Sequence, residues 1–91
     1  MPVDLPDEEL ELNLGSETDA ALLARLRSVV TTAGGSISET SWNVVGSQEI
    51  GTYEILLPRG KLVATTETYV GLSIHGPASL VRDISRAVQR A

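Results

Sequence analysis

The stretch that most constrains the fold is residues 36–75, which shows no helical period. It is rich in Thr, Val, Ile, Tyr and Trp, the residue types that are enriched in β-strands. Two turn signals divide it. Gly46-Ser47 suits a two-residue hairpin turn of type II′, and Pro58 suits the first central position of a type I turn in a four-residue loop. We therefore expect strands at residues 37–45, 48–57 and 62–75.

A further strand and a helix precede this stretch. Residues 9–14 alternate polar side chains with Leu, the pattern of a half-buried strand. A helix begins after residues 16–19, where Ser16 or Thr18 can cap free backbone N–H groups. Gly34-Gly35 ends this helix by accepting the left-handed conformation.

A second helix follows Pro77, which is tolerated in the first turn of a helix. The element order is then β-α-β-β-β-α, which is the α+β class. We expect a four-stranded, mostly antiparallel sheet with two helices packed on one face. Residues 1–8 form a flexible acidic lead-in, and residues 9–91 form a single domain.

The charge of the chain is unevenly distributed. The formal net charge is −5, yet residues 1–19 contain no Lys or Arg, and all seven basic residues follow them. The remainder is close to neutral, whereas a nucleic-acid binder needs a basic surface to displace counterions from phosphates. We therefore expect no nucleic-acid partner, while the acidic lead-in suits a basic surface on a protein partner.

Several kinds of chemistry are excluded by composition. The chain has no Cys and a single His. This excludes disulfides, thiolate zinc sites, cysteine nucleophiles and multi-histidine metal sites. No glycine-rich phosphate loop precedes a helix. We expect no metal, no cofactor and no catalytic residues, and the sequence favours a non-catalytic protein over an enzyme.

Hydropathy predicts a small soluble protein. No apolar run approaches the roughly 18 residues that a membrane span needs, so we expect no membrane association. The first residues lack the basic and apolar regions of a signal peptide. Together with the lack of Cys, this predicts a cytoplasmic location.

The two turns also predict which side chains share a face of the sheet. They place Glu39 opposite Glu54 and Leu57 opposite Leu62. One face is then apolar, and we expect the helices to cover it. Its members are Trp42, Val44, Tyr53, Ile55, Leu57, Leu62, Ala64, Val70, Leu72 and Ile74.

The far face is mostly polar and offers candidate ligand-binding residues. Glu39, Glu54 and Glu67 are expected to lie near one another there, with Tyr69 and His75 on the same face. Facing carboxylates can split their pKa values, bind a divalent ion or act in acid–base chemistry. The simpler interpretation is that they are hydrated surface carboxylates.

The same far face carries candidate partner-interface residues. The register places Ile50 opposite Tyr69 and Leu56 opposite Val63, and Val45 lies on the same face. These apolar side chains can form a contact surface for a second copy or another protein. An ordinary solvated sheet face is the alternative, because scattered apolar surface residues are normal.

We therefore expect a small, non-catalytic, cytoplasmic protein-interaction module that either self-associates or captures a partner protein. The alternative is a small-ligand-binding or minor enzymatic domain that uses the polar sheet face. No sequence motif identifies the biological process.

Overall fold

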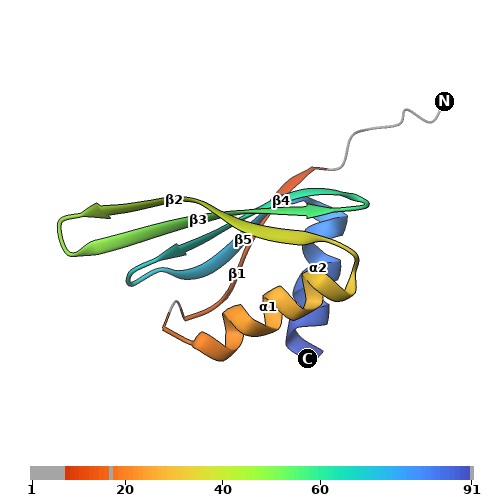
Figure 1. Cartoon of the computed structure of the whole chain (residues 1–91), viewed down its shortest axis with the longest axis horizontal. Coiled ribbons are helices and arrows are strands. Elements are labelled where there is room, and N and C mark those ends of the chain that lie inside the picture. The colour runs from red at the N-terminus through yellow and green to blue at the C-terminus, as the bar shows by residue number, and fades with distance from the viewer. Residues whose placement is uncertain (1–7, 17, 91) are drawn as a thin grey trace.

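The computed structural model describes residues 8–16 and 18–90. They form a five-stranded sheet with two helices on one face (Figure 1), which confirms the α+β class. In chain order the elements are β1 (Glu9–Gly15), α1 (Ala20–Thr32), β2 (Ser36–Val45), β3 (Gln48–Leu57), β4 (Gly60–Glu67), β5 (Gly71–Pro77) and α2 (Ala78–Arg90). Most of the predicted lead-in, residues 1–7, lies outside the described residues.

The order of strands in the sheet is β1-β5-β4-β3-β2, and each neighbouring pair is antiparallel. Strands β2 to β5 follow one another as a meander, which needs only short turns. The chain enters the sheet at β1, which pairs with β5. Strands β1 and β2 are therefore the two edges of the sheet.

The prediction of one long strand over residues 62–75 is wrong, and the sheet has five strands where four were expected. The chain turns at Thr68, Tyr69 and Val70, which separates β4 from β5. Tyr69 adopts a φ of 70°, which is rare for a bulky residue. The turn is fixed to the β2–β3 hairpin, since the backbone N–H of Glu49 donates to Thr68 Oγ1 at 2.9 Å.

The core lies between the two helices and one face of the sheet (Figure 1). Helix α1 begins after Asp19, whose Oδ1 accepts a hydrogen bond from the backbone N–H of Leu22 at 3.1 Å. The cap is therefore Asp19 rather than the predicted Ser16 or Thr18. The buried apolar residues are Leu22, Leu26 and Val30 of α1, Leu80, Val81, Ile84 and Val88 of α2, and Tyr53, Ile55, Leu62, Ala64, Leu72 and Ile74 of the sheet.

The β2–β3 hairpin has the predicted turn. Val45 opposes Gln48 across a two-residue connection, and Trp42 opposes Gly51. A Cβ atom added to Gly51 would lie 2.7 Å from the ring of Trp42. This glycine therefore leaves the space in which the indole lies across the neighbouring strand.

A β-bulge at Thr40 interrupts the same hairpin. The register shifts between Glu39 and Ser41, so that Glu39 opposes Tyr53 and not Glu54 as predicted. A bulge adds one residue to one strand and exchanges the face on which the following side chains lie. Before the bulge, odd-numbered residues of β2 therefore face the helices, and after it even-numbered residues do.

The turn between β3 and β4 is tighter than expected. Leu57 opposes Gly60, and Ile55 opposes Leu62, so the predicted pairing of Leu57 with Leu62 is wrong by two residues. Because the side-chain period of a strand is two residues, this slip leaves every side chain on its predicted face. The apolar face of β3 and β4 is therefore the one that the helices cover.

The helices cover only part of this face. Helix α1 has 13 residues, about 20 Å at 1.5 Å per residue. Strands β2 and β3 have 10 residues each, about 33 Å at 3.3 Å per residue. The hairpin therefore extends beyond the helix layer (Figure 1). We call residues 42–51 of this hairpin, together with the adjoining turn at residues 68–70, the projecting end.

Candidate functional site

The three glutamates predicted to share a face are separated. Glu39 lies on the same side of the sheet as buried Tyr53. Glu54 and Glu67 lie on the open face, but Glu54 opposes Val63, four residues from Glu67 along β4. This separates the two positions by about 13 Å at 3.3 Å per residue. The register on which their predicted proximity depended is therefore wrong.

The other two predicted ligand-binding residues are also apart. Val63 stands between Glu54 and His75 on neighbouring strands, which puts their backbones about 10 Å apart. His75 Nε2 lies 3.7 Å from Glu9 Oε2, and both side chains are exposed. Tyr69 lies in the β4–β5 turn. Within residues 8–16 and 18–90, no group of three His, Asp or Glu is arranged to hold a metal ion.

Four of the five predicted interface residues, Val45, Ile50, Leu56 and Val63, lie on the open face. The expected apolar pairs do not form, because Ile50 opposes Glu67 and Leu56 opposes Lys61. Three of these residues, Ile50, Leu56 and Val63, lie on interior strands, and each has polar or charged neighbours on both adjacent strands. The neighbours are Asn43 and Glu67 for Ile50, Ser36 and Lys61 for Leu56, and Glu54 and His75 for Val63.

A row of short polar side chains crosses the middle of this open face. The residues oppose one another strand by strand from one edge of the sheet to the other: Ser41, Thr52, Thr65, Ser73 and Asn13. Ser73 is buried, and Asn13 Nδ2 donates a hydrogen bond to the backbone carbonyl oxygen of Val70 at 2.8 Å. The hydroxyl groups of the other three can hydrogen-bond to water. The open face is thus a mixed, mainly hydrophilic surface and not a continuous apolar one.

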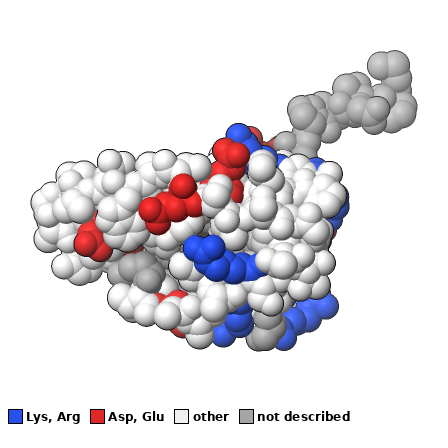
Figure 2. Space-filling view, in the orientation of Figure 1, with Lys and Arg blue, Asp and Glu red and all other residues white. Residues whose placement is uncertain are grey.

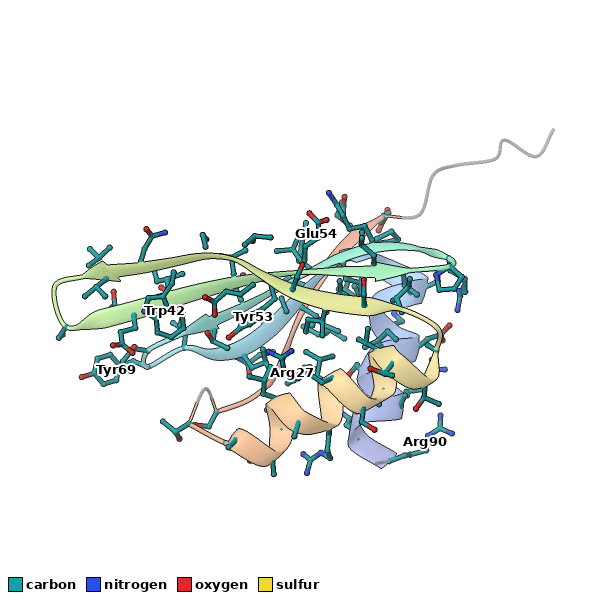
Figure 3. The ribbon with its side chains drawn as sticks, viewed as in Figure 1. Arg27, Trp42, Tyr53, Glu54, Tyr69 and Arg90 are labelled. Atoms are coloured by element: carbon teal, nitrogen blue, oxygen red, sulfur yellow. The ribbon has the colours of Figure 1, made fainter. Side chains whose placement is uncertain are left out.

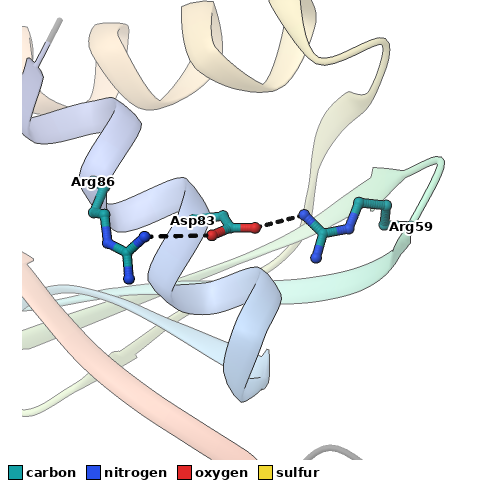
Figure 4. A network of polar contacts seen from close by, with 3 residues as sticks. All are labelled: Arg59, Asp83 and Arg86. Atoms are coloured by element: carbon teal, nitrogen blue, oxygen red, sulfur yellow. Dashed lines mark hydrogen bonds and ion pairs between the residues drawn. The ribbon is translucent and has the colours of Figure 1, made fainter.

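A groove of about 550 Å³ opens between α1, α2 and the β3–β4 turn, with mostly apolar walls. On its rim Arg59 Nη1 donates a hydrogen bond to Asp83 Oδ2 at 2.6 Å, and Arg86 Nη1 lies 3.9 Å from Asp83 Oδ1 (Figure 4). The hydrogen bond from Arg59, aided by the charges of both arginines, lowers the pKa of the Asp83 carboxyl. A carboxylate with a lowered pKa is a weak proton acceptor.

The projecting end exposes apolar side chains that the sequence placed beneath the helices. Trp42, Val44 and Val70 are 49%, 63% and 54% exposed, so the expectation that helices cover them is wrong. Each helix is about 13 Å shorter than β2 or β3, by the helix and strand rises given above. Comparing the lengths of the predicted helices and strands would have revealed this uncovered region.

These residues have apolar neighbours at the same end. Val45 and Tyr69 are 61% and 79% exposed. Val45 lies at the same end on the open face of the sheet, and Tyr69 lies in the adjoining turn. Figure 3 shows both Trp42, on β2, and Tyr69, in the β4–β5 turn, at this end of the molecule. On the face seen in Figure 2, most of this end is uncharged, whereas basic side chains gather around the helices.

A hollow of about 400 Å³ lies between the projecting end and the beginning of α1. It is lined by Trp42 and Tyr53 from the sheet and by Leu23 from the helix, with Glu49 as its charged group. Arg27 lies over the Tyr53 ring, with its guanidinium carbon 5.8 Å from the ring centroid; Figure 3 shows this helix-side arrangement. Thr18, Thr66 and Thr68 complete the lining, so Trp42 borders a concave surface of mixed polarity that can receive a partner side chain.

Comparison with known proteins gives no match: no family model, no curated protein and no solved structure shows significant similarity to this chain. Neither helix in the described residues has the length and apolar character required to cross a membrane.

Proposed function

We propose that this protein is a small protein-interaction module without catalysis of its own, and that it contacts its partner through the projecting end of the sheet. One observation carries the proposal. Among the described residues, the exposed large apolar side chains other than Leu56 gather at this one end: Trp42, Val44, Val45, Tyr69 and Val70. A cytoplasmic location, expected from the lack of Cys, is part of the proposal.

The composition of this set supports a contact with protein. Trp and Tyr are the residues that most often dominate the energy of protein–protein interfaces, because they bury a large area at little conformational cost. Trp42 also adjoins the hollow beneath the sheet, so a partner can surround the ring rather than only touch it. Scattered apolar residues need no explanation, but this set is confined to one end of the fold.

The alternative, a ligand-binding or enzymatic domain on the open face, has less support. Its residues are divided between the two faces of the sheet and a turn, with Glu39 on one face and Tyr69 in the turn. Their side chains would need to converge to bind one small molecule. No observation of their geometry favours this function.

Site-specific photo-crosslinking in the native host cells tests the proposal. A photoreactive phenylalanine analogue replaces Val44 in one variant and Arg82, on the exposed face of α2, in a control variant. We expect a covalent adduct with a protein, either a second copy or another chain, at position 44 only. Absence of an adduct at position 44, or an equal yield at position 82, would refute the proposal.

A further inference from the structure

Strand β2 is a long, open edge of the sheet. It pairs with β3 on one side only, and its 10 residues include a single charged residue, Glu39, and no Pro. The unpaired N–H and C=O groups of an edge strand form a template for another strand. The opposite edge, β1, has 7 residues with acidic side chains at Glu9 and Glu11, which is the kind of charge that blocks such pairing.

The bulge at Thr40 makes β2 complementary to an inverted copy of itself. In an antiparallel pair of β2 strands related by a two-fold axis, directly opposed residues must lie on the same face of the sheet. Consider the register that opposes Ser36 with Val45 of the second copy. Ile37 then opposes Val44 of that copy, and both lie on the helix side.

The match extends along the whole strand only because of the bulge. In this register each odd-numbered residue opposes an even-numbered one, so in a regular strand the two would lie on opposite faces. The bulge exchanges faces at mid-strand. The two-fold axis passes between Thr40 and Ser41, where the bulge interrupts the ladder of hydrogen bonds. The paired segments are therefore residues 36–39 of one copy with residues 42–45 of the other, on either side of the axis.

Charge and burial favour the same register. It sets Glu39 opposite Trp42 of the second copy rather than opposite the other Glu39, so no like charges oppose one another. Ile37 lies at the end of β2 away from the projecting end, and it packs against the helix-covered core. Antiparallel pairing therefore brings the helix-covered end of one copy beside the exposed Val44 of the other.

We propose that β2 pairs antiparallel with β2 of a second copy in this register, joining two five-stranded sheets into one continuous sheet with all four helices on the same face. This inference rests on the proposed function, since it names a second copy as the partner of the projecting end. The dimer is isologous: each copy supplies the same strand, and each contact occurs twice.

A pair of substitutions at one position tests both the dimer and its register. Trp42→Glu creates two Glu–Glu oppositions with residue 39, whereas Trp42→Lys creates two Lys–Glu oppositions, and both remove the indole. Sedimentation equilibrium of the full chain, from about 10 µM to about 1 mM, measures dimerisation. We expect the dissociation constant of Trp42→Glu to exceed that of Trp42→Lys by about tenfold, because the symmetry doubles each pair.

Three further measurements test the same charge pair and the fold of the variants. Combining Trp42→Glu with Glu39→Lys sets Lys at position 39 opposite Glu at position 42 of the second copy. This is the Trp42→Lys pair with both charges exchanged, so dimerisation should return to the level of Trp42→Lys. The difference between the two single variants should shrink between about 50 mM and about 500 mM salt, since exposed charges are screened. Thermal unfolding at a concentration where the chain is monomeric identifies any variant that has lost its fold.

A wild-type chain that stays monomeric throughout, or equal dissociation constants for the two variants, would overturn the β2–β2 dimer. The outcome is distinct from that of the crosslinking experiment. If the chain is monomeric but position 44 still crosslinks to a different protein, self-pairing fails and the interaction module stands. If neither occurs, both proposals fail.

Discussion

The helix-covered part of the sheet and its projecting end contain parts of the same two strands, β2 and β3, yet their side chains have different surroundings. Ile55 is fully buried between the strands and the helices, whereas Val44, on the same side of the sheet, is 63% exposed. Both are β-branched apolar residues. Their difference in burial has two causes: Val44 lies on the edge strand β2, of which only Ile37 is not exposed, and it lies beyond the reach of α1. An apolar pattern thus selects a face, and the position of the strand in the sheet together with the length of the covering helix decides how much of that face is buried.

The largest expected effect tests the core side of this comparison. Leu26→Ala removes a fully buried side chain from α1, and we expect it to lower the free energy of unfolding by about 2–5 kcal/mol. Leu56→Ala is the matched control. Leu56 is 49% exposed, so this variant should lower the free energy of unfolding much less. Urea denaturation measures both. Equal losses would show that the helix layer does not distinguish these positions.

A smaller effect is expected at the junction of the two regions. Gly51→Ala places a methyl group against the Trp42 ring and Thr66 Oγ1. Overpacking of this kind costs about 1–3 kcal/mol. In the Trp42→Ala background one of these collisions is removed, so the cost of Gly51→Ala in unfolding free energy should fall. Additive losses in this double-mutant cycle would mean that the ring does not occupy the space above the glycine.

The charge contacts of the helix-covered part predict a pH effect. The pKa of Asp83 is below its ordinary value of 3.8 because Arg59 donates a hydrogen bond to the carboxylate. The contribution of this pair to stability is therefore complete above the unfolded-state pKa and is lost as the pH falls through the lower folded-state pKa.

Carboxyl-carbon NMR titration measures this pKa directly. Arg59→Gln removes the hydrogen bond and should return the pKa of Asp83 towards 3.8. Arg82 occupies an exposed position in α2, the helix that contains Asp83. The variant Arg82→Gln should leave the pKa of Asp83 lowered. An unchanged titration in Arg59→Gln would show that the guanidinium is not the cause.

The smallest effect on stability is expected at the projecting end itself. Val44→Thr keeps the β-branched shape at a position that is 63% exposed, and we expect the free energy of unfolding to change by no more than about 0.5 kcal/mol. The yield of crosslinking from a neighbouring position should nevertheless fall, since the contact surface becomes more polar. A large loss of stability would instead assign Val44 to the core of the monomer.

Much of this fold could be predicted because its signals are local. The Gly46 turn, the Gly34-Gly35 helix end and the period of β1 each depend on neighbouring residues. Gly71, with a φ of 116°, signals a bulge or bend in the predicted strand. The full turn was missed because Thr68, Tyr69 and Val70 before it carry strand-forming side chains. A contact with the neighbouring hairpin, from Glu49 N–H to Thr68 Oγ1, holds the turn instead.

The candidate site was harder to predict because it depends on register and on relative lengths. The bulge at Thr40 moved Glu39 to the other face, and nothing in the residues around it distinguishes a bulged strand from a regular one. The correct faces of β3 and β4 were recovered despite a wrong loop length, since an error of two residues preserves the face. The exposure of Trp42 follows from the relative lengths of the helices and strands, which the alternation of apolar residues within one strand does not show.

The pairing of β1 with β5 has a consequence for how the chain folds. The meander from β2 to β5 can form from contacts between neighbours in sequence, whereas β1 must wait for a partner about sixty residues away, from Leu12 to Ile74. Closing so long a loop costs conformational entropy before any contact repays it. We therefore expect β1 to be the last strand to join the sheet, both in refolding and on the ribosome. Until it joins, the edge of β5 stays open.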